Sequence, residues 1–175
     1  IPGGHTQFLS VENLGKYKRL GTTIDDALGE AFDKTAKLLG IEFPGGPEIE
    51  NFAKKGNKYK FNLPMPIINK GGCNLSFAGL KTAVLKIAKK IKTQKEKYDL
   101  AASFQFTIEE ILKKKTETAF KEFKKISNKE KKTFVVAGGV AANQNIRQSL
   151  KNLCIKNNFN PIFPDKKLCG DNAAM

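Results

Sequence analysis

The stretch Thr133-Phe134-Val135-Val136-Ala137-Gly138-Gly139-Val140-Ala141-Ala142-Asn143 indicates the fold class. Its first five residues form a run that is too short and too rich in β-branched side chains for a helix. The run therefore predicts a buried strand. The glycine pair predicts a tight turn that lets the backbone approach a ligand. A helix is expected over residues 141–153 and a further short strand over residues 161–164. Strands that alternate with helices indicate an α/β fold, with ligands at the carboxyl ends of the strands.

The rest of the chain is expected to add a hairpin and several helices. Strands are predicted at residues 8–11 and 17–20. Thr23 is the expected N-cap of a helix that has Asp25 and Asp26 in its first turn, Ile24 on its apolar face and Gly40 beyond its end. Pro47 is expected as the first residue of a helix that runs to about Lys54. Residues 55–72 are predicted to be irregular or to form an edge strand. Two long amphipathic helices are expected to follow, the first with Leu80, Val84, Ile87 and Ile91 and the second with Leu100, Phe104, Ile108, Ile111, Phe120 and Phe123.

Composition predicts a globular, soluble and cytoplasmic protein. The 175 residues are 40% hydrophobic, which is enough for one substantial core. The sequence has neither an apolar run of roughly 18 residues nor a signal-peptide pattern at its start, so no membrane association is expected. Cys73, Cys154 and Cys169 are odd in number and far apart, and they lack metal-ligand spacing. We therefore expect reduced thiols rather than disulfides or a zinc module.

The chain is strongly basic, with 31 Lys and Arg against 17 Asp and Glu and a formal charge of +14. Only Arg19 and Arg147 are arginines. This charge is compatible with an RNA partner. An equally plausible alternative is a biased composition in which lysines solvate helix faces, because nucleic-acid surfaces usually also carry arginine and exposed aromatics.

Three glycine pairs predict a cleft that handles phosphate: Gly3-Gly4, Gly45-Gly46 and Gly138-Gly139. Two of them lead into predicted helices, whose first N–H groups attract anions. Asn143 can donate and accept at such a helix start, although a plain helix cap is the simpler interpretation.

Asp33, Glu50 and His5 each have a functional and a structural interpretation. Asp33 falls with Asp26 and Glu30 on the acidic face of its helix; its carboxylate suits two ribose hydroxyls, or it is part of a solvated stripe. Glu50 has the same two interpretations. His5, the only histidine, could contact a phosphate but cannot alone build a metal site. Asp171 is a hard oxygen ligand that needs further ligands from outside the chain. The absence of Met at the start, together with a helix expected to begin at residues 171–175, predicts a fragment.

Taken in order, several motifs resemble the universal tRNA N6-adenosine threonylcarbamoyltransferase family. They are GGHT at 3–6, TIDDA at 23–27, GEAFDK at 29–34, PGGP at 44–47, SFAGLKT at 76–82, GGVAAN at 138–143 and GDNA at 170–173. The resemblance covers essentially the whole chain. It implies the actin-like (ribonuclease-H-like) two-lobed α/β fold of the actin, sugar-kinase and heat-shock-chaperone superfamily. Residues 1–22 would end the first lobe, 23–132 would form the mainly helical part of the second, and 133–175 its nucleotide-facing β/α part.

The resemblance also implies an acyltransferase that modifies tRNA. Members move a threonylcarbamoyl group from threonylcarbamoyl-AMP to N6 of the adenosine beside the anticodon in tRNAs that read ANN codons. The implied partners are tRNA, threonylcarbamoyl-AMP or ATP as the nucleotide ligand, a smaller non-catalytic paralogue and an accessory ATPase. The implied cofactor is one divalent metal ion, Fe²⁺ or Zn²⁺. Carried over by position, the implied nucleotide-binding residues are Ile1, Pro2, Gly3, Gly4, His5, Asp33, Gly46, Glu50 and Asn143, and the implied metal ligand is Asp171.

Two departures from the family pattern keep alternatives open. Pro2 stands where the family usually has Ser, which removes a hydroxyl and an N–H donor. The family's two metal-binding histidines, expected upstream of His5, are absent from these residues, so the fragment alone is expected to be inactive. An ATPase or sugar kinase of the same superfamily is one alternative function. A non-catalytic paralogue that scaffolds an active enzyme is another, whereas a metalloprotease is disfavoured because there is a single histidine.

Overall fold

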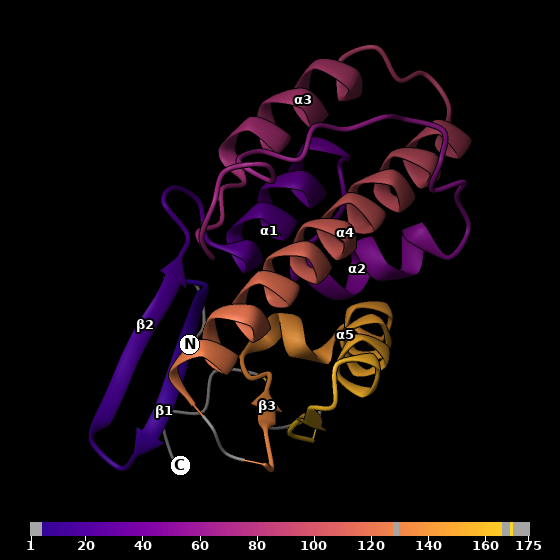
Figure 1. Ribbon diagram of the computed structural model, residues 1–175. Coiled ribbons are helices and arrows are strands. Elements are labelled where there is room, and N and C mark those ends of the chain that lie inside the picture. The colour runs from indigo at the N-terminus through magenta and orange to yellow at the C-terminus, as the bar shows by residue number, and fades with distance from the viewer. Residues whose placement is uncertain (1–4, 128–129, 166–168, 170–175) are drawn as a thin grey trace.

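A β-hairpin, a group of packed helices and a short parallel sheet follow one another along the chain (Figure 1). The computed structural model describes residues 5–127, 130–165 and 169. The elements are β1 (Gln7–Asn13), β2 (Lys16–Thr22), α1 (Leu28–Leu38), α2 (Gly45–Ala53), α3 (Ala78–Ala88), α4 (Gln94–Ile126), β3 (Thr133–Val135), the 3₁₀ turn η1 (Gly139–Ala142), α5 (Gln144–Lys156) and β4 (Asn160–Ile162). The predicted mixed α/β class is confirmed. None of the helices in the described ranges has the length and apolar character that crossing a membrane requires.

The predicted hairpin is confirmed, with slightly longer strands. β1 and β2 are antiparallel, and Val11 lies opposite Tyr17. Gly15 adopts a φ of 79° in the connecting turn, a conformation that glycine reaches without steric cost.

The prediction that Thr23 caps the first helix is wrong. α1 starts at Leu28, after the N-cap residue Ala27. Residue Thr23 forms a backbone bridge with Leu75 instead, and Ile24, expected on the apolar face, is 60% exposed. The Asp25 carboxylate accepts hydrogen bonds from the N–H groups of Phe77 (2.7 Å) and Ala78 (3.3 Å), so it caps the start of α3. The acidic residues that signal a helix start therefore serve a different helix.

The predicted end of α1 at Gly40 is confirmed, since Leu39 is the C-cap and Gly40 has a φ of 69°. α2 was expected to begin at Pro47, but it begins at Gly45, and Pro47 occupies the third helical position. The missing N–H of proline costs nothing there either, because the first turn of a helix has no intrahelical acceptors. Residues 55–72 contain no helix or strand, so the irregular alternative is confirmed and the edge-strand alternative is wrong.

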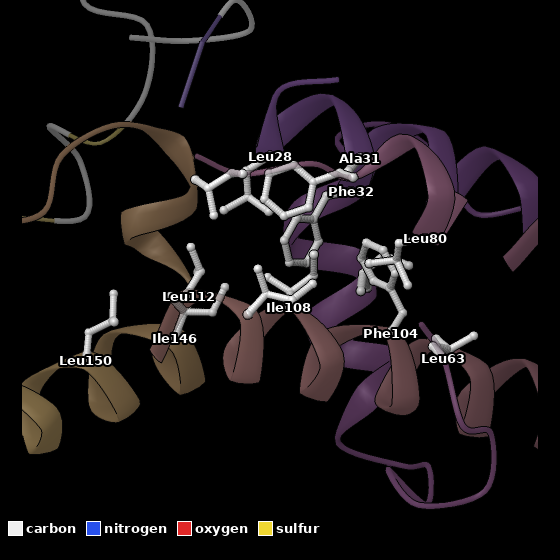
Figure 2. Close-up of a cluster of buried hydrophobic side chains, with 14 of the residues drawn as sticks. Leu28, Ala31, Phe32, Leu63, Leu80, Phe104, Ile108, Leu112, Ile146 and Leu150 are labelled. Carbon is white, nitrogen blue, oxygen red and sulfur yellow. The ribbon is translucent and has the colours of Figure 1, made fainter. Parts of the chain in front are cut away.

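The core lies where α4 crosses α1, α3 and α5. α4 spans 33 residues, and its N-cap Thr93 forms a capping box with Glu96. Phe104 of α4 packs edge-on against Phe32 of α1, with ring centroids 5.2 Å apart. Figure 2 shows the cluster, which includes Leu28, Leu80, Ile108, Leu112, Ile146 and Leu150. Both predicted amphipathic helices are present, but the first ends at Ala88, so Ile91, which was predicted on its apolar face, lies beyond it. Each fully buried leucine or isoleucine contributes about 1.5–3 kcal/mol through its removal from water.

β3, α5 and β4 form the predicted strand–helix–strand unit. The two strands are parallel and paired in register from Thr133 with Asn160 to Val135 with Ile162. Phe134 contacts Phe120 of α4 on the covered face of this sheet. The expectation that the strand is buried is wrong, because Val135 is 58% exposed. A parallel strand is buried only when both faces and both edges are covered, and among the described strands β4 alone pairs with β3.

Candidate nucleotide site

The GGHT segment is anchored through its threonine. The Thr6 hydroxyl accepts a hydrogen bond from the N–H of Leu28, the first residue of α1, at 3.1 Å. The Thr6 carbonyl accepts from the N–H of Thr23 at 2.8 Å. His5 is exposed beside this anchor. Ile1, Pro2, Gly3 and Gly4 lie outside the described residues, as does Asp171.

Asp33 joins α1 to the first turn of α2. Its Oδ1 accepts from the N–H of Gly45 at 3.0 Å, which places a carboxylate at the positive end of α2. A Cβ on Gly45 would lie 2.7 Å from the Cα of Asp33 and 2.8 Å from the Cβ of Ala36. Glycine is therefore required for the two helices to meet. Oδ2 of Asp33 makes no hydrogen bond to another described residue, so it can accept from a ligand hydroxyl.

Gly46 carries the free backbone donor of this turn. Helix geometry leaves the first few N–H groups without intrahelical acceptors. The N–H of Gly45 is taken by Asp33, and Pro47 has none. A Cβ built on Gly46 meets nothing within 4 Å, so the space above this residue is open. The sequence Gly-Gly-Pro thus presents one unhindered N–H at the N-terminus of α2.

Glu50 connects α2 to the start of α5. Its side chain is buried, and Oε1 accepts from the N–H of Gln144, the first residue of α5, at 3.0 Å. As with Asp33, one carboxylate oxygen compensates a helix N-terminus, while Oε2 has no hydrogen-bond partner in the described parts of the chain.

Asn143 is the N-cap of α5, as its simpler interpretation predicted. Its Oδ1 accepts from the N–H of Ile146 at 3.0 Å, and its Nδ2 donates to Oε1 of Gln105 on α4 at 2.9 Å. Both Asn143 and Gln105 are buried. The helix predicted over residues 141–153 therefore starts at Gln144, and the Gly138-Gly139 pair leads into η1 instead. Gly138 has a φ of 99°, so this turn does require glycine.

The acidic stripe predicted on α1 is divided between two roles. Asp26 and Glu30 both pair with Lys34, and Asp26 also pairs with Lys81 of α3 at 3.0 Å. The hydrogen bond from Lys34, supported by Lys81, lowers the pKa of Asp26 below its ordinary value of 3.8, against the opposing effect of burial. Asp33 takes no part in this cluster, which leaves its carboxylate directed to α2.

A hollow of about 320 Å³ opens beside Asp33 and Gly45. Its size lies at the lower end of the range for small-molecule sites. Its lining is mostly apolar and includes Ile41 and Phe43. The hollow touches Asp33 but not Gly46, Glu50 or Asn143. The structure thus links Asp33, Gly46, Glu50 and Asn143 through α2 and the start of α5.

Comparison with known proteins identifies the family. The family model described as TsaD, tRNA N6-adenosine threonylcarbamoyltransferase, matches residues 1–175. The chain belongs to the tRNA N6-adenosine threonylcarbamoyltransferase family. A relative with this name from Pelagibacter ubique (strain HTCC1062) is 73% identical over 175 residues. Relatives of the same name from Rickettsia rickettsii (strain Sheila Smith) and Rickettsia bellii (strain OSU 85-389) are each 52% identical over 99% of the chain.

The chain spans about half the length of these threonylcarbamoyltransferases. It covers 49% of the Pelagibacter protein and 51% of each of the two Rickettsia proteins, although nearly all of its own residues align. The described residues include no group of three or more His, Cys, Asp or Glu side chains that could hold a metal ion.

Sequence reasoning missed two residues that shape the site. Gln105 on α4 accepts a hydrogen bond from Asn143 and is buried. Its place directly after Phe104, within the apolar part of α4, was the sequence signal that could have indicated this role. Arg147 donates from Nε to the Ala141 carbonyl (2.9 Å) and from Nη2 to the Pro164 carbonyl (2.8 Å). It thereby fastens η1 to the segment after β4. No local sequence signal predicts it.

Proposed function

We propose that the whole protein transfers a threonylcarbamoyl group from threonylcarbamoyl-AMP to N6 of the adenosine beside the anticodon in tRNAs that read ANN codons. The observation that carries this proposal is the family match over all 175 residues, together with 73% identity to a relative of that name. The fold assignment goes with it: an actin-like two-lobed protein in which residues 1–22 end one lobe, 23–132 form the helical part of the other, and 133–175 form its nucleotide-facing part.

The adenylate would be held by the residues around α2. Asp33 and Glu50 each have one carboxylate oxygen engaged with a helix N-terminus and a second oxygen available, which suits ribose hydroxyls. The free N–H of Gly46 suits a ligand oxygen, and Asn143 lies at the start of α5 next to the residue that Glu50 holds. Ile1, Pro2, Gly3, Gly4 and His5 would line the same adenylate, and the Thr6 anchor supports this placement for His5.

The chemistry needs positioning more than side-chain nucleophiles. An acyl-adenylate is already activated, so the protein has to orient a weak amine toward the carbonyl and stabilise oxyanion charge. Carboxylates that hold the ribose in a fixed position contribute to the orientation, because they reduce the number of orientations that the acyl group can adopt relative to the amine. A backbone N–H in a fixed helix turn requires no reorganisation when charge develops.

The proposal includes a single metal ion, iron or zinc, with Asp171 as one of its ligands. The described residues do not fit a metal centre by themselves, since His5 is the only histidine and no cluster of ligands occurs among them. Further ligands would have to come from outside these residues. The proposed partners are tRNA, a smaller non-catalytic paralogue and an ATPase.

The test uses the full-length protein with threonylcarbamoyl-AMP and a tRNA that reads ANN codons, and it measures threonylcarbamoyladenosine by mass spectrometry of nucleosides. Asp33→Asn and Glu50→Gln keep an acceptor for Gly45 and Gln144 but remove the charge. Product should form with the wild type and fall in both variants, while their melting temperatures stay near wild type. Absence of product with the wild type and its partner proteins, combined with sugar-dependent ATP hydrolysis, would overturn the proposal in favour of a kinase.

A further inference from the structure

Nearly all of the net positive charge of the chain lies in one continuous stretch. Residues 51–95 contain eleven lysines and no aspartate or glutamate. They therefore carry +11 of the total +14, which leaves +3 for the other 130 residues. The other 130 residues hold 18 lysines, but all 17 acidic residues lie there too and largely balance them. The concentration in one quarter of the sequence requires a local explanation.

After the end of α2 at Ala53, this stretch continues as an irregular loop that is fixed against α4. A Cβ on Gly56 would lie 2.0 Å from the carbonyl oxygen of Tyr98, so the loop and helix backbones are in direct contact. The N–H of Asn57 donates to the Asp99 carboxylate at 2.7 Å, and the N–H of Phe61 donates to the Ser103 hydroxyl at 3.1 Å. In Figure 1 the loop leaves α2 and passes beside the beginning of α4. The loop is ordered before any partner arrives.

This fixed loop carries three exposed lysines and one exposed aromatic ring, with Lys55 over the ring of Tyr98 and Lys58 beside that of Tyr59. Lys54, Lys55 and Lys58 are all exposed, and Tyr59 is 72% exposed. The Lys58 ammonium lies 5.0 Å from the centroid of the Tyr59 ring and 4.7 Å from that of Phe106. A cation over an aromatic face remains free to bind an anion on its other side.

Neighbouring carboxylates do not neutralise these lysines. Asp99 is buried and already accepts from Asn57, and Glu96 is engaged in the capping box of α4. Glu109 lies near Lys58, and the Lys58 charge opposes the rise in the pKa of the Glu109 carboxyl that burial causes, but the two side chains form no ion pair. Within the described parts of the chain, Lys54, Lys55 and Lys58 form no ion pair.

We propose that the loop over residues 54–59 is an RNA-binding surface, on which Tyr59 stacks with an unpaired base and Lys54, Lys55 and Lys58 contact phosphates. This inference rests on the proposed function and identifies the surface that receives the tRNA. Unpaired bases stacked on aromatic side chains beside a basic groove are the usual mode of single-strand recognition. One exposed tyrosine offers too little apolar area for insertion into a bilayer, which favours RNA over a membrane surface.

The position of the loop relative to the candidate nucleotide site supports this partner. α2 carries Gly46 in its first turn and ends next to Lys54. Eight residues of helix at 1.5 Å per residue separate the two by about 12 Å. One RNA loop can therefore reach both the start of α2, beside the candidate nucleotide site, and Lys54 at its end.

The experiment measures binding of the full-length protein to an anticodon stem-loop RNA from a tRNA that reads ANN codons, as a function of salt. In the triple variant K54Q/K55Q/K58Q, the slope of log K against log salt should become shallower by about 2, because each lost phosphate contact to single-stranded RNA removes about 0.7. Tyr59→Leu should weaken binding on the order of tenfold, and Tyr59→Phe, which keeps the ring, should not.

The matched control removes three exposed lysines from other elements, as K121Q/K151Q/K156Q. It changes the net charge equally and should leave the salt slope unchanged. Threonylcarbamoyladenosine formation is measured in parallel, with a rise in KM for tRNA and little change in kcat expected for the loop variants.

Three results would overturn the inference. Equal losses in the loop and control triples would mean that only total charge matters. Wild-type affinity and slope in the loop variants, with product still formed, would refute the surface while sparing the proposed function. Loop-dependent binding to phosphatidylserine vesicles with unchanged RNA affinity would assign the loop to a membrane. If the wild type formed no product and bound no RNA, the proposed function itself would fail.

Discussion

The two adjacent glycines at the start of α2 should respond oppositely to alanine. In Gly45→Ala, the new methyl would meet Asp33 and Ala36 at 2.7–2.9 Å, closer than real Cβ contacts allow. Overpacking of this kind costs about 1–3 kcal/mol. In Gly46→Ala, the methyl enters open space, and the higher helix propensity of alanine contributes up to about 1 kcal/mol of stability.

Thermal unfolding of the full-length variants measures the difference. At about 2–4 °C per kcal/mol for a domain of this size, Gly45→Ala should lower Tm by about 2–12 °C, and Gly46→Ala should raise it by up to about 4 °C. Titration with an adenine nucleotide should then show weaker binding for Gly46→Ala, because its methyl occupies the space above the free N–H. If the two variants shifted Tm in the same direction, or if Gly46→Ala bound nucleotide as well as wild type, the account of this turn would be refuted.

Three further predictions concern the helical body. Asp25→Ala should destabilise the protein by about 1–2 kcal/mol in urea unfolding, because α3 loses its cap, and an unchanged midpoint would contradict that role. Asp26→Asn should lower the free energy of unfolding by roughly 1 kcal/mol at pH 7, because the ion pairs with Lys34 and Lys81 are lost. The pKa of Asp26 is lowered in the folded protein, so the stability that its carboxylate contributes is lost as the pH falls through that folded pKa. The variant should therefore cost nothing once the pH is well below 3.8. The buried Lys115 ammonium donates to the carbonyls of Lys70 (3.0 Å) and Gly72 (3.2 Å). Lys115→Met should therefore raise the rate of amide hydrogen exchange around residues 70–72 about tenfold and leave the middle of α4 unaffected. An equal rise in both regions would argue against this role.

Periodicity and turn chemistry predicted most of the elements. α4 and the hairpin could be found because apolar spacing and Gly15 are local signals. The start of α1 could not, because Asp25 has the sequence of a local cap but binds backbone groups 52 residues away. The exposure of Val135 was also missed, since a β-branched run indicates a strand but says nothing about which neighbours cover it.

The candidate site divides in a similar way. Asp33, Gly46 and Glu50 could be selected from sequence, and their assignment to a nucleotide stays a prediction. Sequence could not show that the neighbouring Gly45 donates to Asp33, which is what leaves Gly46 as the free donor. The support of Asn143 by Gln105 depends on the crossing of α4 and α5, a tertiary contact that no single segment encodes.

The hydrogen bond from Gln144 to Glu50 spans 94 residues of sequence. A ligand that donates a hydrogen bond to Oε2 of Glu50 would make Oε1 a weaker acceptor. The hydrogen bond from the N–H of Gln144 at the start of α5 would then weaken. α5 in turn connects β3 to β4. Hydrogen exchange at the Gln144 N–H would then report, from a position 94 residues away in sequence, whether a ligand is bound beside α2.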